Sequence, residues 1–204
     1  IDEAQDYSLG QLKLISKIFR NASYTILGDI NQTINPYYRY ESLEDIKKIL
    51  PDSKYIELTK TYRSSEEIVE YSNRVLGLNH VTAIRRNKPV PVDEVVEGEL
   101  NSQLRHDIEE CKLHGKSIAI ITKNQDECDK IYKMLSDTGI SKIDNSSKKF
   151  NRKFIVVPVY MAKGLEFDSV IIYTDKNNKY TKDEKYLYYV AITRAQHKLI
   201  VYNQ

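Results

Sequence analysis

The stretch KFIVVPVYMAKGLEFDSVIIYT, residues 153–174, holds two short apolar runs on either side of a polar turn. Residues 153–160 and 169–174 are rich in β-branched side chains and are apolar almost without interruption. Runs of this kind are typical of strands that are covered on both faces. We therefore expect this stretch to supply two strands of a mostly parallel, buried sheet.

The same alternation of short apolar runs with helical patterns continues along the chain. Further strand candidates are residues 24–27, 54–58, 117–122 and 198–202. Three pairs fit the capping box that marks a helix start: Ser8 with Gln11, Ser64 with Glu67, and Thr181 with Glu184. Gly115 and Gly139 lie where two helices are expected to end. Strands that alternate with helices predict an α/β fold with a parallel sheet and flanking helices.

Two segments interrupt this alternation, and the first part of the chain has few predicted elements. Residues 77–100 contain prolines and lack a helical period, which predicts a long irregular connection, and residues 141–152 are polar and basic, which predicts an exposed loop. Residues 1–53 hold a helix but only one strand candidate, too little to bury a sheet. We expect them to be the tail of a domain that continues upstream, and residues 54–204 to form a second α/β unit.

The composition excludes a membrane-spanning protein and an overall basic nucleic-acid binder. The chain has 204 residues, 41% of them hydrophobic, and a net charge of +2. No apolar run approaches the ~18 residues that a membrane helix needs, and the start does not read as a signal peptide. Cys111 and Cys128 lack the spacing of a metal or redox site. We expect a cytoplasmic protein with no membrane partner.

Polar clusters lie where strands of the predicted sheet end, the usual place for ligands in such sheets. In DEAQD, residues 2–6, Asp2 can hold Mg²⁺ and Glu3 can activate an attacking water. Adjacent acids before a helix can also simply stabilise its positive end. In GDINQ, residues 28–32, Gln32 can contact a terminal phosphate or the water, although the segment also reads as a strand-ending turn.

Two further clusters combine cationic, aromatic and acidic side chains. In TYRSS, Arg63 can neutralise charge on a transferred phosphoryl group and Tyr62 can stack on a base. Capping by a serine would leave both residues unexplained. In MAKGLEFD, Lys163 and Gly164 form a flexible cationic turn suited to phosphates, and Glu166 can accept a hydrogen bond from a ribose hydroxyl.

A fifth cluster, YVAITRA at residues 189–195, places Arg194 at the end of a helix, where it can act as a second arginine finger. The series DEAQD, GDINQ, TYRSS, AKGLEFD and YVAITRA resembles the ordered motifs of the UvrD/Rep group of superfamily 1 helicases. DEAQDYS followed by LGDINQTI more narrowly resembles the HelD and helicase IV-like branch.

The resemblance implies the end of a first RecA-like lobe in residues 1–53 and a second RecA-like lobe in residues 54–204. In this family two such lobes close on ATP and Mg²⁺ and move along single-stranded DNA, usually 3′ to 5′. The implied roles are Asp2 as metal-coordinating acid, Glu3 as catalytic base, Gln32 as γ-phosphate sensor, Tyr62 as adenine-stacking residue, Arg63 and Arg194 as arginine fingers, Glu166 as ribose contact and Lys163-Gly164 as the loop near the nucleotide.

The sequence also departs from the family pattern. The phosphate-binding loop, G-x-x-x-x-G-K-S/T, does not occur, so we expect these residues alone not to hydrolyse ATP and an N-terminal ATPase lobe of the same protein to be their partner. Tyr160 stands where many relatives have a histidine that contacts nucleic acid. Tyr37, Tyr38 and Tyr40 lie near Arg39 where relatives carry a base-stacking tryptophan, and either one of these tyrosines stacks a base or the segment is an ordinary surface loop.

Three hypotheses follow. The first is the C-terminal portion of an ATP-dependent superfamily 1 DNA helicase or translocase that acts on single-stranded DNA. The second is a HelD-like factor that binds RNA polymerase and uses ATP to release stalled transcription complexes, for which an upstream coiled-coil arm would be diagnostic. The third is a degenerate domain that only binds, and the presence of both arginines and both carboxylates is evidence against it.

Overall fold

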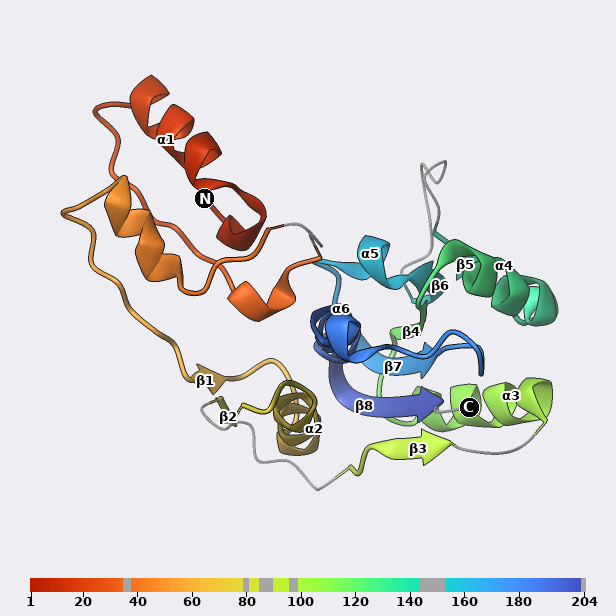
Figure 1. Ribbon diagram of the computed structural model, residues 1–204. Helices are drawn as coiled ribbons and strands as arrows, with labels where there is room; N and C mark the ends of the chain where they lie inside the picture. Colours follow the sequence, from red (N-terminus) through yellow and green to blue (C-terminus); the bar gives the residue numbers. More distant parts are fainter. Residues whose placement is uncertain (35–37, 79–80, 85–89, 96–98, 144–152, 203–204) are drawn as a thin grey trace. The chain divides into compact units, whose positions relative to one another are not determined.

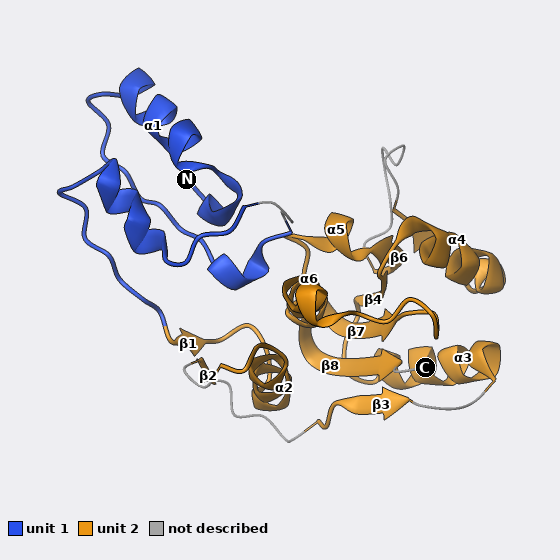
Figure 2. Ribbon diagram, viewed as in Figure 1, with its two compact units in different colours: residues 1–58 blue, residues 59–204 orange. Residues whose placement is uncertain are grey.

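The structure is a computed structural model of the 204-residue chain, and it describes residues 1–34, 38–78, 81–84, 90–95, 99–143 and 153–202 (Figure 1). The contacts within the chain separate two compact units, residues 1–58 and residues 59–204 (Figure 2). The large parallel sheet lies entirely within the second unit.

Six parallel strands form the centre of the second unit, in the order β3-β8-β7-β4-β6-β5. Their bounds are Asp93–Val95 (β3), Ile118–Thr122 (β4), Ser141–Lys142 (β5), Phe154–Pro158 (β6), Phe167–Tyr173 (β7) and Ala195–Tyr202 (β8). The strands predicted from the apolar runs at 117–122, 153–160, 169–174 and 198–202 are confirmed as β4, β6, β7 and β8. Every residue of β4 is buried, as a strand covered on both faces requires.

Helices cover this sheet, which confirms the predicted α/β class. Their bounds are Glu66–Leu76 (α2), Leu100–Lys112 (α3), Gln125–Met134 (α4), Val159–Ala162 (α5) and Lys185–Ile192 (α6). Apolar side chains of α3 and α4 share one buried cluster with Ile118 and Ile120 of β4. Ala119 and Ile121 point to the opposite face because side chains alternate along a strand, and both are buried there as well.

The start of β7 is fixed by the acid of the LEFD segment. Asp168 Oδ2 accepts hydrogen bonds from the backbone N–H groups of Lys116 (2.8 Å) and Ser117 (2.9 Å) and from Ser117 Oγ (2.8 Å). A Cβ at Gly115 would lie 2.1 Å from Asp168 Cβ, so this glycine is needed for close approach. Partial burial raises the pKa of Asp168, but the hydrogen bonds from Ser117 and Lys116 outweigh it and hold the pKa below its ordinary value.

The first unit consists of one α-helix, short 3₁₀ turns and extended segments. The bounds are Ala4–Asp6 (η1), Leu9–Ile18 (α1), Ile30–Gln32 (η2) and Leu43–Lys48 (η3). Ser8 and Gln11 form the predicted capping box at the start of α1. A small core of Ala4, Leu12 and Ile46 is surrounded by half-buried apolar residues. Across the described segments of both units, none of the helices has the length and apolar character that crossing a membrane demands.

Two predicted strands, residues 24–27 and 54–58, are wrong. Leu27 N–H donates to Ile1 O and Ala4 N–H to Leu27 O, both at 2.8 Å, so residues 25–27 run beside residues 1–4 without a ladder long enough to form a strand. Residues 54–58 are extended and exposed, and pairing begins only at β1, Lys60–Thr61, which lies parallel to β2, Thr82–Ala83. An apolar run forms a strand only where a neighbouring strand is available.

The structure differs from several local predictions, in part because of tertiary contacts. Ser64 does not cap α2, because its hydroxyl donates to Ala195 O at 2.7 Å and the helix begins after Ser65. Thr181 and Glu184 form the predicted capping box ahead of a short turn, Lys182–Glu184 (η5), that leads into α6. The predicted connection 77–100 contains β2 and β3, and the predicted loop 141–152 begins with β5. Residues 79–80, 85–89, 96–98 and 144–152 lie outside the described part.

Candidate nucleotide site

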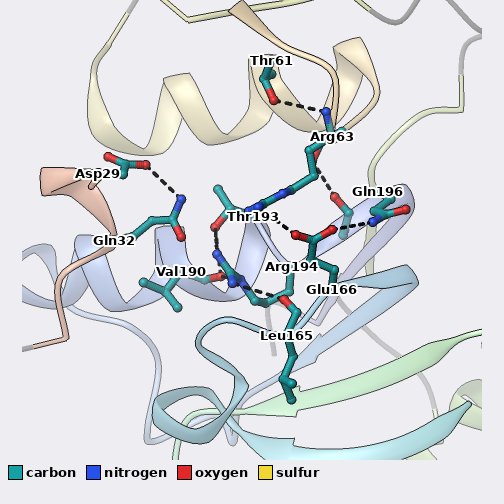
Figure 3. Close-up of polar contacts among 12 residues, drawn as sticks. Asp29, Gln32, Thr61, Arg63, Leu165, Glu166, Val190, Thr193, Arg194 and Gln196 are labelled. Carbon is teal, nitrogen blue, oxygen red and sulfur yellow. Dashed lines mark hydrogen bonds and ion pairs between the residues drawn. The ribbon is translucent and has the colours of Figure 1, made fainter. Parts of the chain in front are cut away.

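Three polar side chains from three separate elements meet in the second unit (Figure 3). Arg63 Nη2 lies 2.7 Å from Glu166 Oε1, and Gln196 Nε2 donates to Glu166 Oε2 at 2.8 Å. Arg63 follows β1, Glu166 precedes β7 and Gln196 belongs to β8. The structure therefore brings together two residues that the sequence singled out, and it adds Gln196, which no motif indicated.

This cluster opens onto a hollow of about 570 Å³ lined by Tyr62, Arg63, Ile84, Glu166 and Gln196. Tyr62 is 72% exposed, so its ring is available to stack on a flat ligand. Arg63 and Glu166 are both partly exposed, and an exposed ion pair contributes only about 0–1 kcal/mol. A ligand can therefore replace this pair at small cost. The hollow presents an aromatic face, a cation and a carboxylate, which suit the base, phosphates and sugar of a nucleotide.

Two hydrogen bonds fix the segment that carries Arg63 against the start of β8. Ser64 Oγ donates to Ala195 O at 2.7 Å, and Ser65 N–H donates to Gln196 O at 2.9 Å. The TYRSS and TRAQ segments are thus joined directly, although about 130 residues separate them in sequence. The position of Arg63 depends on this junction and not on helix capping.

Arg194 occupies a different environment from Arg63. Its side chain is only 1% exposed. The guanidinium donates three hydrogen bonds of 3.1 Å, to Val190 O, Leu165 O and Thr193 Oγ1 (Figure 3). Arg194 therefore ties the end of α6 to the loop before β7. To reach a phosphate it would have to exchange some of these bonds, so its predicted role as a finger stays a prediction.

The loop between α5 and β7 depends on a glycine. Gly164 has φ +76°, a left-handed conformation that favours glycine, and a Cβ there would meet nothing within 4 Å. The constraint is thus the backbone angle and not the space. Leu165 N–H closes the turn by donating to Ala162 O at 3.0 Å. Lys163, which is half-buried, and the exposed Glu166 stand on either side of this turn.

In the first unit, Asp2 and Glu3 lie where the chain leaves its extended start. Glu3 has φ 52° and ψ 42°, a left-handed conformation that costs a non-glycine residue roughly 1–3 kcal/mol. Its N–H donates to Asp2 Oδ1 at 2.8 Å. Asp2 is exposed and Glu3 half-buried. Gln32 lies in η2, where its Nε2 donates to Asp29 Oδ2 at 2.9 Å (Figure 3).

The residues predicted to contact nucleic acid do not form one cluster within either unit. Tyr37 lies outside the described residues. Tyr38 is exposed and packs edge-on against Tyr40, which is buried and donates its hydroxyl to Tyr7 O at 2.7 Å. Tyr40 is therefore a core residue and cannot stack a base. Arg39 donates to Ile30 O and Asn31 Oδ1, both at 3.4 Å. In the second unit, Tyr160 is exposed on α5.

Comparison with known proteins settles the family. The profile of the UvrD-like helicase C-terminal domain matches residues 99–204, more than half of the chain. The chain belongs to this family. The matched region includes β4 to β8 together with the loop of Glu166 and the α6–β8 corner of Arg194. Asp2, Glu3 and Arg63 lie before it.

Relatives and solved structures agree with a UvrD-like helicase C-terminal domain. ATP-dependent DNA helicase Rep of Buchnera aphidicola subsp. Schizaphis graminum is 32% identical over 82 residues, which span 39% of this chain and 12% of that relative. The crystal structure of the C-terminal domain of a possible DNA helicase from Lactobacillus plantarum WCFS1 is similar with a TM-score of 0.56 and 26% identity, over 70% of this chain and 86% of that one.

A more distant structure shares the fold alone. The PRRSV helicase is 14% identical with a TM-score of 0.54, and the likeness covers 99% of this chain and 34% of the viral one. The six-stranded parallel sheet with flanking helices is thus the RecA-like arrangement of helicase C-terminal domains. The aligned part makes up only about an eighth of the Rep relative, at 12% of its length.

Proposed function

We propose that this chain is the C-terminal part of a UvrD/Rep-type superfamily 1 DNA helicase that uses ATP and Mg²⁺ to move along single-stranded DNA, 3′ to 5′ by resemblance. The observation that carries the proposal is the hollow of the second unit, where Tyr62 and Arg63 meet Glu166, which lies in the region that matches a helicase C-terminal domain. Their chemistry matches the three parts of a nucleotide.

In the proposed mechanism the second unit supplies charge to an in-line phosphoryl transfer. Tyr62 stacks on the adenine, and Glu166 leaves its partner Arg63 to accept a hydrogen bond from the ribose. The released guanidinium then neutralises charge that develops on the γ-phosphoryl group, as arginine fingers do. Arg194 adds a second cation after exchanging part of its contacts with α6 and the Leu165 loop.

The first unit carries the acidic residues of the proposed mechanism. The exposed carboxylate of Asp2 is an oxygen ligand of the kind that Mg²⁺ prefers, so Asp2 fits the metal-holding role. Bound Mg²⁺ neutralises charge on the phosphates. Glu3 orients and deprotonates the attacking water, and Gln32 contacts the γ-phosphate.

The proposal requires residues upstream of this chain to complete the first lobe. The absence of G-x-x-x-x-G-K-S/T from the sequence means that direct contacts to the β- and γ-phosphates must come from elsewhere. Leu14, Ile18 and Phe19 of α1 are large apolar side chains that are exposed in the first unit. We infer that the missing part of the first RecA-like lobe covers them.

The HelD-like alternative rests on the resemblance of DEAQDYS and LGDINQTI to that branch. It uses the same ATP site and differs in the partner, RNA polymerase. Two assays on the full-length protein separate the functions. ATP-dependent unwinding of a 3′-tailed DNA duplex supports the helicase, whereas release of RNA polymerase from stalled complexes without unwinding supports the alternative.

The sharpest test of the proposed site is Arg63→Ala in the full-length protein. A true arginine finger should lose about 10³-fold or more in ATP turnover. Arg74→Ala is the matched control, because Arg74 is exposed on the same helix that follows Arg63 and faces Tyr71 instead of the hollow. A loss of only a few-fold for Arg63→Ala, or an equal loss for both variants, would remove Arg63 from the catalytic role.

A further inference from the structure

A buried amide lies between the two acidic motifs of the first unit. Gln5 is 1% exposed. Its Nε2 donates to Glu3 Oε2 at 2.5 Å, and its Oε1 accepts the backbone N–H of Asp29 at 3.1 Å. The carboxylate can only accept and the N–H can only donate, so the two partners together require a side chain that offers both functions. An amide meets this requirement.

The connection continues beyond Asp29. Asp29 Oδ2 accepts a hydrogen bond from Gln32 Nε2, and Asp29 Oδ1 accepts one from Asn31 N–H, both at 2.9 Å. A continuous path of hydrogen bonds therefore runs from Glu3 through Gln5 and Asp29 to Gln32. It joins the proposed catalytic base to the proposed γ-phosphate contact within one compact unit.

The glycine of the GDINQ motif gives independent support. A Cβ at Gly28 would lie 2.7 Å from Gln5 Oε1 and 3.1 Å from both Ala4 N and Leu43 Cδ1. The backbone before Asp29 can thus approach the amide only because residue 28 has no side chain. The left-handed backbone of Glu3 (φ 52°) persists in the same place, which indicates that its surroundings hold it there.

We propose that Gln5 is a positioning residue that fixes the carboxylate of Glu3 relative to the Asp29–Gln32 turn, so that water activation and γ-phosphate contact are held in register. The inference rests on the proposed function, because it gives Gln5 a purpose in the reaction assigned to Glu3 and Gln32. Gln5 itself touches no reacting atom. A simple core amide would stabilise the fold equally well, so the test must separate positioning from stability.

The experiment measures steady-state ATP turnover and thermal unfolding of the full-length protein. Gln5→Leu removes both hydrogen bonds at similar volume, and Gln5→Glu keeps the acceptor for Asp29 N–H but replaces the donor to Glu3 by a like charge. Both variants should lower kcat by about 10- to 100-fold while KM for ATP stays within about twofold, because the base is displaced and binding is not.

A double-mutant cycle supplies the readout that stability alone would not change. If Gln5 acts through the path to Gln32, adding Gln32→Ala to Gln5→Leu should slow turnover much less than Gln32→Ala slows the wild type. Leu12→Ala is the matched control, since it empties the small core of the same unit without touching the path. It should lower the melting temperature without lowering kcat at a temperature where the protein is folded.

The inference is overturned if both Gln5 variants keep kcat within about twofold of wild type. It is also overturned if the effects of Gln5→Leu and Gln32→Ala on kcat multiply independently, or if Leu12→Ala lowers kcat as much as the Gln5 variants do. If Gln5→Leu does not fold, Gln5→Glu carries the same comparison. Glu3→Gln distinguishes failure of the proposed function from failure of the positioning role of Gln5. Normal turnover of Glu3→Gln defeats the proposed function, whereas loss with Glu3→Gln and normal turnover with Gln5→Leu and Gln5→Glu defeats only the role of Gln5.

Discussion

The two units of the chain differ in how completely they bury their apolar residues. In the second unit, a continuous core joins α3 and α4 to the strands, and β4 is buried at all of its residues. In the first unit, the core cluster has three fully buried members, and Leu14 on α1 remains 59% exposed. The second unit has the core of a stable domain, whereas the first leaves large apolar side chains of α1 exposed.

The residues proposed to act on the nucleotide differ in the same way between the two units. Arg63, Glu166 and Gln196 are held by strands and helices that the second unit completes by itself. Asp2 and Glu3 lie at the start of the chain, where the backbone of residues 1–4 is hydrogen-bonded to residues 25–27. The cationic residues are thus positioned by a completed sheet, whereas the acidic residues belong to a unit with a small core.

The largest expected effect is the loss of all activity when the chain is isolated. Residues 1–204 alone should hydrolyse ATP no faster than a buffer blank, because the sequence lacks the phosphate-binding loop. Phosphate release with and without single-stranded DNA measures this. DNA-stimulated turnover by the isolated chain would contradict this expectation, because Asp2 and Glu3 would then act without further residues.

The next largest effect is expected from apolar substitutions, which should change the free energy of unfolding much more in the second unit than in the first. Ile171→Ala in the buried cluster of the second unit should lower the free energy of unfolding by about 2–5 kcal/mol. Leu14→Ala should change it by less than about 0.5 kcal/mol in the isolated chain, because the side chain is already exposed. Urea denaturation followed by circular dichroism measures both.

The same Leu14→Ala substitution can be measured in the full-length protein. There we expect a clearly larger loss of unfolding free energy than in the isolated chain, because upstream residues cover α1 in the proposed lobe. Equal losses in the two proteins would mean that this face of α1 stays in water and would weaken the inferred packing.

Asp168 should give a smaller effect that depends on pH. Its folded-state pKa lies below the ordinary value of 3.8, so its carboxylate stabilises the fold fully above that value and loses this contribution as the pH falls through the lowered pKa. Asp168→Asn should therefore lower stability by about 1–3 kcal/mol at neutral pH.

The difference between wild type and Asp168→Asn should shrink as the pH falls through the lowered pKa of Asp168, because the wild-type carboxylate then becomes protonated. Thermal unfolding at neutral and acidic pH measures it. A difference that is independent of pH would show that the carboxyl group contributes by shape and not by charge.

The smallest effect is expected at the surface of the first unit. Glu44 and Lys47 form an exposed i,i+3 ion pair at 2.7 Å. Glu44→Gln should change the free energy of unfolding by less than about 0.5 kcal/mol, as measured by the same denaturation. A loss above about 1 kcal/mol would mean that η3 carries more of the stability of this unit than its small core indicates.

The sequence was most informative where strands are buried on both faces. The apolar runs within β4, β6, β7 and β8 predicted these strands because a strand that is covered on both faces consists mostly of apolar residues. β3 and β5 were missed because they are edge strands of three and two residues, too short to show a period. Residues 24–27 have a strand-like composition, but among the described residues they pair only with residues 1–4.

The candidate site was predictable to a similar extent. Chemistry and motif order singled out Arg63 and Glu166, which the structure places in contact. Gln5 and Gln196 could not be found in this way, because a glutamine is recognisable as a connector only once both of its hydrogen-bond partners are in place. Ser64 shows the same limit, since its bond to Ala195 joins segments far apart in sequence.

The acidic residues at the start of this chain, Asp2 and Glu3, are proposed to take part in ATP hydrolysis. Glu3→Gln in the full-length protein tests it most directly, with turnover and equilibrium ATP binding measured on the same preparation. We expect ATP hydrolysis to be abolished while ATP still binds, because the amide of glutamine cannot deprotonate the attacking water. An unchanged kcat would contradict it.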